Sequence, residues 1–373
     1  MKNALPDWLN PGKGVAISRR ANARDVLNAM ASESPGLNEL AALLSPAAFP
    51  FLEPMAQKAL NLTRRHFGRT IALYVPLYLS NYCSSGCAYC GFAADRKHPR
   101  KRLERGAIVS EMEALRKMGF EEILLLTGER TPQADFNYLR DAVILAAERF
   151  SLVTVESFPM TMEEYKKLTE AGCTGITIYQ ETYDPEIYDK MHRWGPKKDF
   201  INRLETPARA LSAGMRSVGL GALLGLADPV MEAVALFQHI ECLRREYWQG
   251  GFSISFPRVR SQAGGFTPAN PVGDSFLAQM IFAFRICLPE IHLTLSTRES
   301  PGFRDGIAGI GISKMSIASK TTVGGYNTDH HAEPGQFDVV DTRTLKSFRR
   351  VLDAKGLQAV FKNWDAVFAG GPA

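Results

Sequence analysis

The chain has 373 residues, of which 45% are hydrophobic and 22% are charged, with six cysteines and a formal net charge of +5. This composition is typical of a globular protein and excludes a disordered chain or a disulfide-rich scaffold. No apolar run reaches the roughly 20 residues of a membrane span, and the basic residues form no long stripe that would indicate nucleic acid. Because the N-terminus lacks a continuous apolar stretch and the cysteines are few and partly clustered, we expect a cytoplasmic protein.

Two regions of the chain differ in their pattern. Residues 1–70 predict a helical lead-in, because 21–30 and 36–44 have helix-forming composition before prolines 46, 50 and 54 interrupt the pattern. From residue 71, β-rich apolar runs alternate with segments of helical spacing. We expect strands at 71–78, 122–127, 152–156, 175–179, 217–223, 252–256, 291–296 and 310–317, and helices at 104–118, 135–149, 161–171, in segments up to 213, and at 229–247, 274–287 and 344–355.

Eight strands with crossover helices predict an α/β fold, a parallel (β/α)8 barrel over 71–373. Residues 1–70 would form an N-terminal helical extension, and a C-terminal helical extension would pack on the barrel. Such barrels carry active sites at the carboxyl ends of their strands. We therefore expect a site there, beside a Gly/Pro-rich loop at 262–273. Polar or glycine residues do fall at these ends, at 83, 127–129, 156, 180–181, 219–221, 257–258, 296–299, 316 and 319–320.

Three cysteines follow the first expected strand closely, as Cys83, Cys87 and Cys90. Cys sulfur binds iron–sulfur clusters, zinc or Cu(I) in preference to hard cations. Three thiolates leave one position open in a [4Fe–4S] cluster or a structural zinc site. A zinc knuckle and three unconnected cysteines are the alternatives. The remaining cysteines lie in or beside expected helices, which favours packing over metal binding: Cys173, Cys242 and Cys287.

The spacing C-x3-C-x2-C, with Tyr89 before the last cysteine and Gly91-Phe92 after it, resembles the signature of the radical S-adenosylmethionine (SAM) superfamily. The resemblance implies a [4Fe–4S] cluster on Cys83, Cys87 and Cys90, whose open iron binds the amino and carboxylate groups of SAM. Thr127-Gly128-Glu129 resembles the Gly-Gly-Glu element that holds the methionyl amino group, with Thr in place of the first Gly. A strand-end Glu is otherwise commonly a helix cap or a surface acid.

Further contacts with SAM follow from the same resemblance. Glycines 219, 221 and 225 let a backbone edge approach a flat ligand, and the resemblance implies that Gly221 and Ala222 contact the adenine. Tight barrel packing explains these glycines equally well. The carboxylate of Glu181 can hold hydroxyl groups, and the guanidinium of Arg203 can hold a carboxylate. A surface ion pair between the two is the alternative. The resemblance assigns four residues to the polar surroundings of SAM: Tyr89, Glu156, Glu181 and Arg203.

Segments spread over nearly the whole chain after the lead-in resemble the aromatic-amino-acid lyases of this superfamily, and among them the tyrosine lyases of anaerobic thiamin thiazole biosynthesis. They lie at 76–81, 127–129, 179–183, 199–206, 219–226, 253–258, 295–301 and 324–326. The resemblance implies hydrogen abstraction from the amino group of L-tyrosine and scission of its Cα–Cβ bond, which gives 2-iminoacetate and p-cresol. It also implies a low-potential electron donor and handover of the product to a thiazole synthase.

Three residues are predicted to hold the amino-acid substrate. Arg298, which follows the seventh expected strand, can form a bidentate fork on the tyrosine carboxylate. Tyr78 and Ser316 resemble polar residues that line the substrate site of the lyases. Ordinary barrel packing is the alternative for both.

Other activities remain open on the sequence. A tryptophan lyase would differ only in its pocket, and a non-catalytic iron–sulfur or zinc protein would not need an open metal position. A related maturase cleaves tyrosine but needs a second cluster on a C-terminal Cys motif, and no cysteine follows Cys287. The basic run 96–102 indicates a solvated loop or a contact with an anionic partner. The pair His330-His331 receives no role, because adjacent side chains point apart in regular structure.

Overall fold

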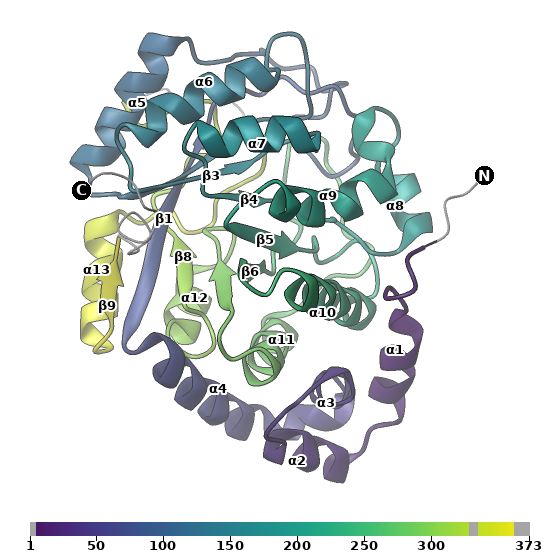
Figure 1. Ribbon diagram of the computed structural model, residues 1–373. Helices are drawn as coiled ribbons and strands as arrows, with labels where there is room; N and C mark the ends of the chain where they lie inside the picture. Colours follow the sequence, from purple (N-terminus) through teal and green to yellow (C-terminus); the bar gives the residue numbers. More distant parts are fainter. Residues whose placement is uncertain (1–4, 328–334, 362–373) are drawn as a thin grey trace.

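Residues 5–327 and 335–361 are described by a computed structural model, in which eight parallel strands close into a barrel (Figure 1). The strands are neighbours in the order β2-β3-β4-β5-β6-β7-β8-β1, and β1 also pairs with β2. This confirms the predicted (β/α)8 barrel, and each strand overlaps its expected position. The strands are β1 (Thr70–Tyr78), β2 (Glu122–Leu126), β3 (Leu152–Glu156), β4 (Gly175–Thr177), β5 (Ser217–Gly221), β6 (Gly251–Ser255), β7 (His292–Leu295) and β8 (Lys314–Ser316).

Helices cover the outside of the barrel (Figure 1). In chain order they are α5 (Arg105–Lys117), α6 (Phe136–Ala147), α7 (Met162–Glu170), α8 (Pro185–Met191), the short 3₁₀ helix η2 (Pro196–Lys198), α9 (Phe200–Ser212), α10 (Pro229–Glu246), α11 (Asp274–Cys287) and α12 (Pro301–Ile307). The expected C-terminal helix is α13 (Leu345–Ala354). No helix in the described ranges is long and apolar enough to cross a membrane.

The segment between β7 and β8 differs from the prediction. The sequence analysis placed no helix there and began the eighth strand at residue 310, whereas α12 occupies this segment and β8 begins at Lys314. Ser300 accepts a hydrogen bond from the Phe303 amide (3.3 Å) and Pro301 opens the helix, which are ordinary N-terminal signals. Gly309 and Gly311, with φ of 75° and 92°, turn the chain before the strand can start.

A ninth strand, β9 (Gln358–Val360), was not predicted. It pairs with Thr70–Ala72 of β1, whereas β2 pairs with Val75–Tyr78. β8 pairs with one edge of β1. β9 and β2 both pair with the opposite edge of β1, β9 near its amino end and β2 near its carboxyl end. Three residues are too few for an alternating pattern to be recognised in a sequence.

The lead-in is helical, as expected, but contains three helices besides the two that the sequence analysis placed at 21–30 and 36–44. Its elements are α1 (Pro11–Arg20), α2 (Ala23–Ala31), α3 (Leu37–Leu43), the 3₁₀ helix η1 (Pro46–Phe51) and α4 (Leu52–Phe67). Pro54 lies in the first turn of α4, where backbone N–H groups have no helical partner and a proline is tolerated. Helices α1 and α4 pack on α10 and α11. The predicted boundary at residue 70 coincides with the start of β1, and its standing as a domain boundary stays a prediction.

Small residues line the barrel interior on β4, β5 and β6. A β-carbon on Gly219 would lie 2.8 Å from Thr177 Oγ1 and 3.0 Å from Ser253 Oγ. Barrel interiors are usually filled by bulky branched side chains. Glycine, serine and threonine stand here instead, and they pack so closely that position 219 has no room for a side chain.

Arg285 forms hydrogen bonds with two turns at the amino end of the barrel. Its side chain is fully buried on α11 and donates to the carbonyl oxygens of Gly311 (2.9 and 2.7 Å), Pro289 (2.8 Å) and Ile291 (2.8 Å). One guanidinium therefore satisfies the turns that precede both β7 and β8. Buried carbonyls without a donor cost free energy, so these turns depend on Arg285.

We expect Arg285→Met to lower the free energy of unfolding by about 3 kcal/mol or more, because the buried carbonyls of Gly311 and Ile291 and the partly buried one of Pro289 lose this donor, at roughly 1–3 kcal/mol for each buried group. Urea denaturation would measure the loss. The matched control is Arg350→Met on the exposed side of α13, which should change stability by less than about 0.5 kcal/mol. Equal stability of the two variants would contradict the anchoring role.

Candidate functional site

The cysteine loop after β1 is held by the chain segment that follows α8. The Gly86 amide donates to the Trp194 carbonyl (3.0 Å), and Cys87 forms an isolated antiparallel bridge with His192. We call residues 191–197 the clamp. The loop has no helix or strand of its own, so these backbone contacts fix its path.

Two glycines allow the clamp to approach the loop. A β-carbon on Gly86 would collide with the Trp194 ring, and one on Gly195 would lie 2.5 Å from Ser85 Oγ. Gly195 also has φ of 92°, a conformation that side chains rarely adopt. The Lys197 amide then donates to Ser85 Oγ (3.2 Å). Glycine is therefore required at position 195, where a β-carbon would meet backbone atoms, whereas a side chain at position 86 would displace the Trp194 ring.

Tyr89 is oriented by the clamp through His192. Burial, and then the charge of Lys197, lower the pKa of His192 to about 3, so the imidazole is neutral. Its Nδ1 lies 2.8 Å from the Tyr188 carbonyl oxygen and must carry the proton, which leaves Nε2 to accept from the Tyr89 hydroxyl at 2.7 Å. Tyr89 is thereby fixed next to the last cysteine of the loop.

Four buried charged side chains form a row beside the cysteine loop. Arg203 lies 3.1 Å from a Glu129 carboxylate oxygen and 3.7 Å from Glu181 Oε1, which Lys197 contacts at 2.6 Å. The four side chains are between 6% and 13% exposed. The alternative that Glu181 and Arg203 form a surface ion pair is therefore wrong.

Glu181 is constrained in both charge and backbone. Burial alone would raise its pKa, but the charges of Lys197 and Arg203 outweigh burial and hold the pKa below its usual value. Its φ is 70°, in a region that non-glycine residues rarely occupy, and the Leu223 amide donates to its carbonyl (2.7 Å) while Ala222 forms a bridge with it. Such strain persists only where surrounding contacts enforce it, and it concentrates at functional sites.

The residues of the Thr127-Gly128-Glu129 element meet the first cysteine. The Glu129 amide donates to Cys83 Sγ (3.4 Å), and a β-carbon on Gly128 would lie 2.5 Å from the Tyr82 carbonyl oxygen. Glu129 Oε1 accepts from Arg203, whereas the buried Oε2 has no partner among the described residues. An unpartnered carboxylate oxygen beside a cysteine loop fits a ligand ammonium group.

All three cysteines of the loop are free thiols. Burial, and then the neighbouring charges of Cys90 and Glu129, raise the pKa of Cys83 to about 11, and burial raises that of Cys87 further. Each would therefore release a proton on binding metal. Within residues 5–327 and 335–361, no three His, Cys, Asp or Glu side chains converge as the ligands of one metal ion. The cluster is therefore inferred from the spacing of Cys83, Cys87 and Cys90.

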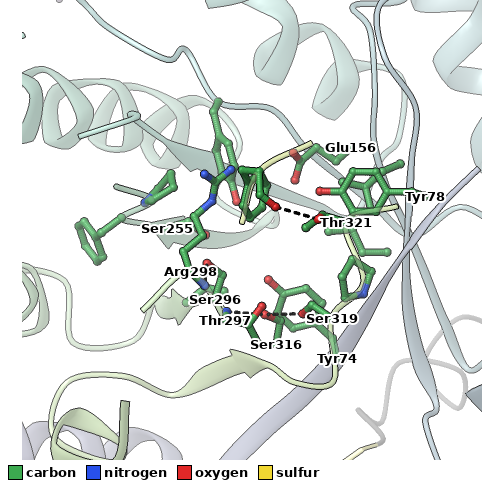
Figure 2. A pocket seen from close by; sticks show the side chains of 18 residues that line it. Tyr74, Tyr78, Glu156, Ser255, Ser296, Thr297, Arg298, Ser316, Ser319 and Thr321 are labelled. Carbon is green, nitrogen blue, oxygen red and sulfur yellow. Dashed lines mark hydrogen bonds between the residues drawn. The ribbon is translucent and has the colours of Figure 1, made fainter. Parts of the chain in front are cut away.

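Two adjoining cavities lie inside the carboxyl end of the barrel, and Figure 2 shows the first of them with Glu156, Arg298 and Tyr78 around it. The second reaches Cys90 and Tyr89. Both cavities share five lining residues: Glu156, Tyr179, Pro257, Arg298 and Phe337. The cysteine loop and the barrel interior therefore open onto one continuous site.

Arg298 lies in the lining that both cavities share. Its guanidinium stacks on the Phe337 ring, 3.3 Å from the centroid, and no described residue accepts a hydrogen bond from it. By contrast, Arg258 and Arg260 both donate to Glu299. Arg298 is thus available for an anionic ligand, and its role in holding the tyrosine carboxylate stays a prediction.

Glu156 faces Arg298 across the first cavity (Figure 2). Burial, and then the charge of Glu181, raise the pKa of Glu156 to about 7, although Arg298 and Lys197 oppose the shift. The carboxyl group can therefore exist in both protonation states near neutral pH. Groups with such shifted pKa values are concentrated at active sites.

The floor of the first cavity is lined with hydroxyl groups. Tyr74 and Ser316 pair across β1 and β8, and Ser316 forms a hydrogen bond with the Tyr74 hydroxyl. Ser316 Oγ also accepts from the Thr297 amide (3.2 Å) and lies 3.3 Å from Ser319 Oγ (Figure 2). Tyr78 lies four residues beyond Tyr74 on the same side of β1, where its hydroxyl donates to Gln336 (2.8 Å).

The predicted site residues divide into two groups by position. Those that line neither cavity are packed around the cysteine loop or between strands. For example, Thr127 Oγ1 lies 2.5 Å from Ser157 Oγ, and a β-carbon on Gly221 would lie 2.7 Å from the Tyr179 ring. Packing therefore accounts for Gly221, and its contact with adenine stays a prediction. Seven predicted residues line the cavities: Tyr78, Tyr89, Cys90, Glu156, Glu181, Arg298 and Ser316.

Several residues of the site were missed by the sequence analysis. Tyr74 carried a usable signal, because it stands four positions before Tyr78 on a strand and must face the same side. Lys197 and His192 carried none, since their loop looks like any basic surface turn. Phe337 reaches the cavity from a loop far along the chain. His330 and His331 lie outside the described residues.

Comparisons with known proteins place these features in context. Residues 77–237 match the radical SAM superfamily, and residues 255–358 match the biotin and thiamin synthesis associated domain. The chain is 44% identical to the 2-iminoacetate synthases of Salmonella typhimurium and Escherichia coli, over 92% of this chain and 91% of each relative. The solved structure of the FeFe-hydrogenase maturase HydG from Carboxydothermus hydrogenoformans is similar with a TM-score of 0.85 and 30% identity, over 95% of this chain and 82% of that chain.

We expect Gly195→Ala to reduce the iron and sulfide that the protein retains after anaerobic reconstitution, because the added β-carbon pushes the clamp away from Ser85. Gly214→Ala is the matched control, since Gly214 has φ of 93° but nothing within 4 Å of an added β-carbon. Both variants carry the same backbone strain, so iron analysis isolates the contact. Similar iron content in the two variants would mean that the clamp does not hold the loop.

Proposed function

Since this chain belongs to the radical SAM superfamily and, within it, to the family of the 2-iminoacetate synthases, we propose that it cleaves the Cα–Cβ bond of L-tyrosine. The products are 2-iminoacetate (dehydroglycine) and p-cresol, and SAM gives 5′-deoxyadenosine and methionine. The enzyme is a carbon–carbon lyase that serves the thiazole of thiamin. The 44% identity over 92% of the chain is the observation that carries this function.

Enzymes of this superfamily use a [4Fe–4S] cluster and SAM, and the residues fit both groups. Cys83, Cys87 and Cys90 would hold three irons and leave the fourth for SAM. The unpartnered Glu129 Oε2 fits the SAM ammonium, and Arg203 keeps that carboxylate in place. When bound, the two groups supply the carbon radical that takes hydrogen from tyrosine, and the protein provides orientation.

Arg298 is the proposed anchor of the tyrosine carboxylate. Its guanidinium is held flat on Phe337 and has no acceptor among the described residues, so it can make a bidentate pair without breaking another contact. Because Arg298 lines both cavities and Cys90 lines the second, a substrate held there by its carboxylate could turn its amino group towards the cysteine loop. Glu156 lines both cavities too, which supports a role between cofactor and substrate.

The floor of the first cavity is the proposed site of the phenol group. A carboxylate held at Arg298 directs the substrate ring into the barrel, where Tyr74 and Ser316 present hydroxyl groups. A site that hydrogen-bonds a substrate hydroxyl discriminates strongly against an analogue that lacks it. This observation favours tyrosine over tryptophan, whose ring offers an N–H in a different place.

Other parts of the proposal rest on the family. A low-potential donor must supply one electron for each SAM cleavage, and a thiazole synthase is the proposed acceptor of the unstable 2-iminoacetate. A cytoplasmic location is supported by the free thiols. The identity of 44% to the 2-iminoacetate synthases, against 30% to the maturase HydG, favours the thiamin lyase over the maturase.

We expect the reconstituted protein, incubated anaerobically with SAM, a reductant and tyrosine, to form 5′-deoxyadenosine and p-cresol, and Cys87→Ala to form neither.

Arg298→Ala should keep SAM binding but lose most p-cresol formation, because the substrate carboxylate loses its partner. Liquid chromatography would quantify both products. Absence of both products from a wild-type protein with a full cluster would refute the lyase function, and product from tryptophan alone would reassign it.

We expect Tyr74→Phe to lower kcat/KM for tyrosine by about tenfold, the value of one lost hydrogen bond of roughly 1–1.5 kcal/mol, while SAM binding is unchanged. Tyr165→Phe is the control, because Tyr165 is buried on α7 outside both cavities. Steady-state p-cresol formation would measure both. A loss in Tyr165→Phe equal to that in Tyr74→Phe would contradict a direct role of the Tyr74 hydroxyl.

A further inference from the structure

Most of the net charge of the chain lies in one short segment after the cysteine loop. Residues 95–102 hold five Lys or Arg residues and one Asp, a net charge of +4, whereas the whole chain carries +5. The remaining 365 residues therefore contribute only +1. A charge concentrated in this way attracts negatively charged partners over the range of the Debye length.

This basic segment is attached to the cysteine loop. Arg96 donates to the Ala88 carbonyl (2.8 Å), and Arg100 donates to the carbonyl of Phe92 (2.8 Å). The segment is therefore more than the solvated loop that the sequence analysis considered. Lys97 remains exposed between these two anchored residues.

An exposed aromatic side chain continues this surface. Trp194 is 42% exposed, although it lies against Gly86 between the first two cysteines. The Arg193 guanidinium stacks on its ring at 4.5 Å and also lies 2.8 Å from Asp95 of the basic segment. These contacts join the clamp and the basic segment into one surface directly outside the cysteine loop.

We propose that this surface, formed by Lys97, Arg193, Trp194 and Lys198 and called here the Trp194 face, docks an acidic single-electron carrier protein. Exposed Trp and Arg side chains are the residue types that dominate binding energy at protein interfaces. Redox partners form small, transient interfaces whose association is steered by complementary charge. A carrier docked here would meet the outer side of the loop that carries the cluster cysteines.

The inference rests on the proposed function only in that the cluster must accept an electron. One electron passes from the reduced carrier to the oxidised cluster, the carrier is oxidised by one electron, and no proton or bond is transferred in the encounter. The substrate cavity lies on the barrel side of the same loop. The carrier and the amino acid would therefore approach the cluster from different sides.

The test measures reduction of the cluster itself, by its absorbance in an anaerobic stopped-flow instrument, with reduced flavodoxin as the acidic carrier and dithionite as the small-molecule reductant. The variant is Lys97→Glu with Lys198→Glu; both side chains are exposed, and that of Lys198 also pairs with Asp189, which is exposed too. The control is Lys346→Glu with Arg350→Glu, two exposed charges on α13. We expect the first pair to slow reduction by flavodoxin by roughly tenfold or more at low salt, with a difference that shrinks as salt rises.

Reduction by dithionite should be the same in the wild type and both variants. The proposal is overturned if the two double variants slow flavodoxin equally, if neither slows it, or if dithionite reduction falls in step with flavodoxin reduction. Because the readout is the cluster, slowed reduction in a protein that fails to cleave tyrosine would sink the lyase function and leave the docking surface standing.

Discussion

The active site depends on backbone pairing between the cysteine loop and the clamp. A loop without regular structure can place three thiolates only if its backbone N–H and C=O groups have fixed partners. Here the partners come from a segment about a hundred residues further along the chain, through bonds such as Gly86 to Trp194. The two segments approach so closely that residue 195 must lack a side chain, and a side chain at residue 86 would displace the Trp194 ring. The barrel positions both segments, and the backbone contacts with the clamp fix the path of the cysteine loop.

The buried charges beside the loop follow from the same arrangement. Taking Glu129, Arg203, Glu181 and Lys197 out of water carries a desolvation cost that their mutual attraction only partly offsets, so the row is a poor device for stability alone. It makes sense as a polar binding surface. Arg203 holds one oxygen of Glu129 and leaves the other free, and Lys197 keeps Glu181 ionised in a strained backbone conformation. Charges fixed in this way need not reorganise when a ligand arrives.

The barrel and the cysteine loop could be predicted from the sequence, but the clamp could not. Alternation of strands and helices is a local pattern, so β1 to β8 were predictable, and the spacing of Cys83, Cys87 and Cys90 is equally local. Pro54 and the three-residue β9 show where local patterns fail, since a proline in a first turn or a very short strand has no distinct signal. Lys197, His192 and Phe337 reach the site through tertiary packing, and no spacing along the chain reveals them.

The cysteine loop has a polar cavity on its inner side, towards the barrel, and a charged surface on its outer side. On the inner side, Arg298 and the hydroxyl groups of Tyr74 and Ser316 line one cavity at the carboxyl end of the barrel. On the outer side, the segment 95–102, with a net charge of +4, contacts Arg193 next to Trp194. A cluster between the two sides can receive an electron without opening the cavity to solvent. A radical reaction needs that separation, because reactive intermediates are protected only where water is excluded.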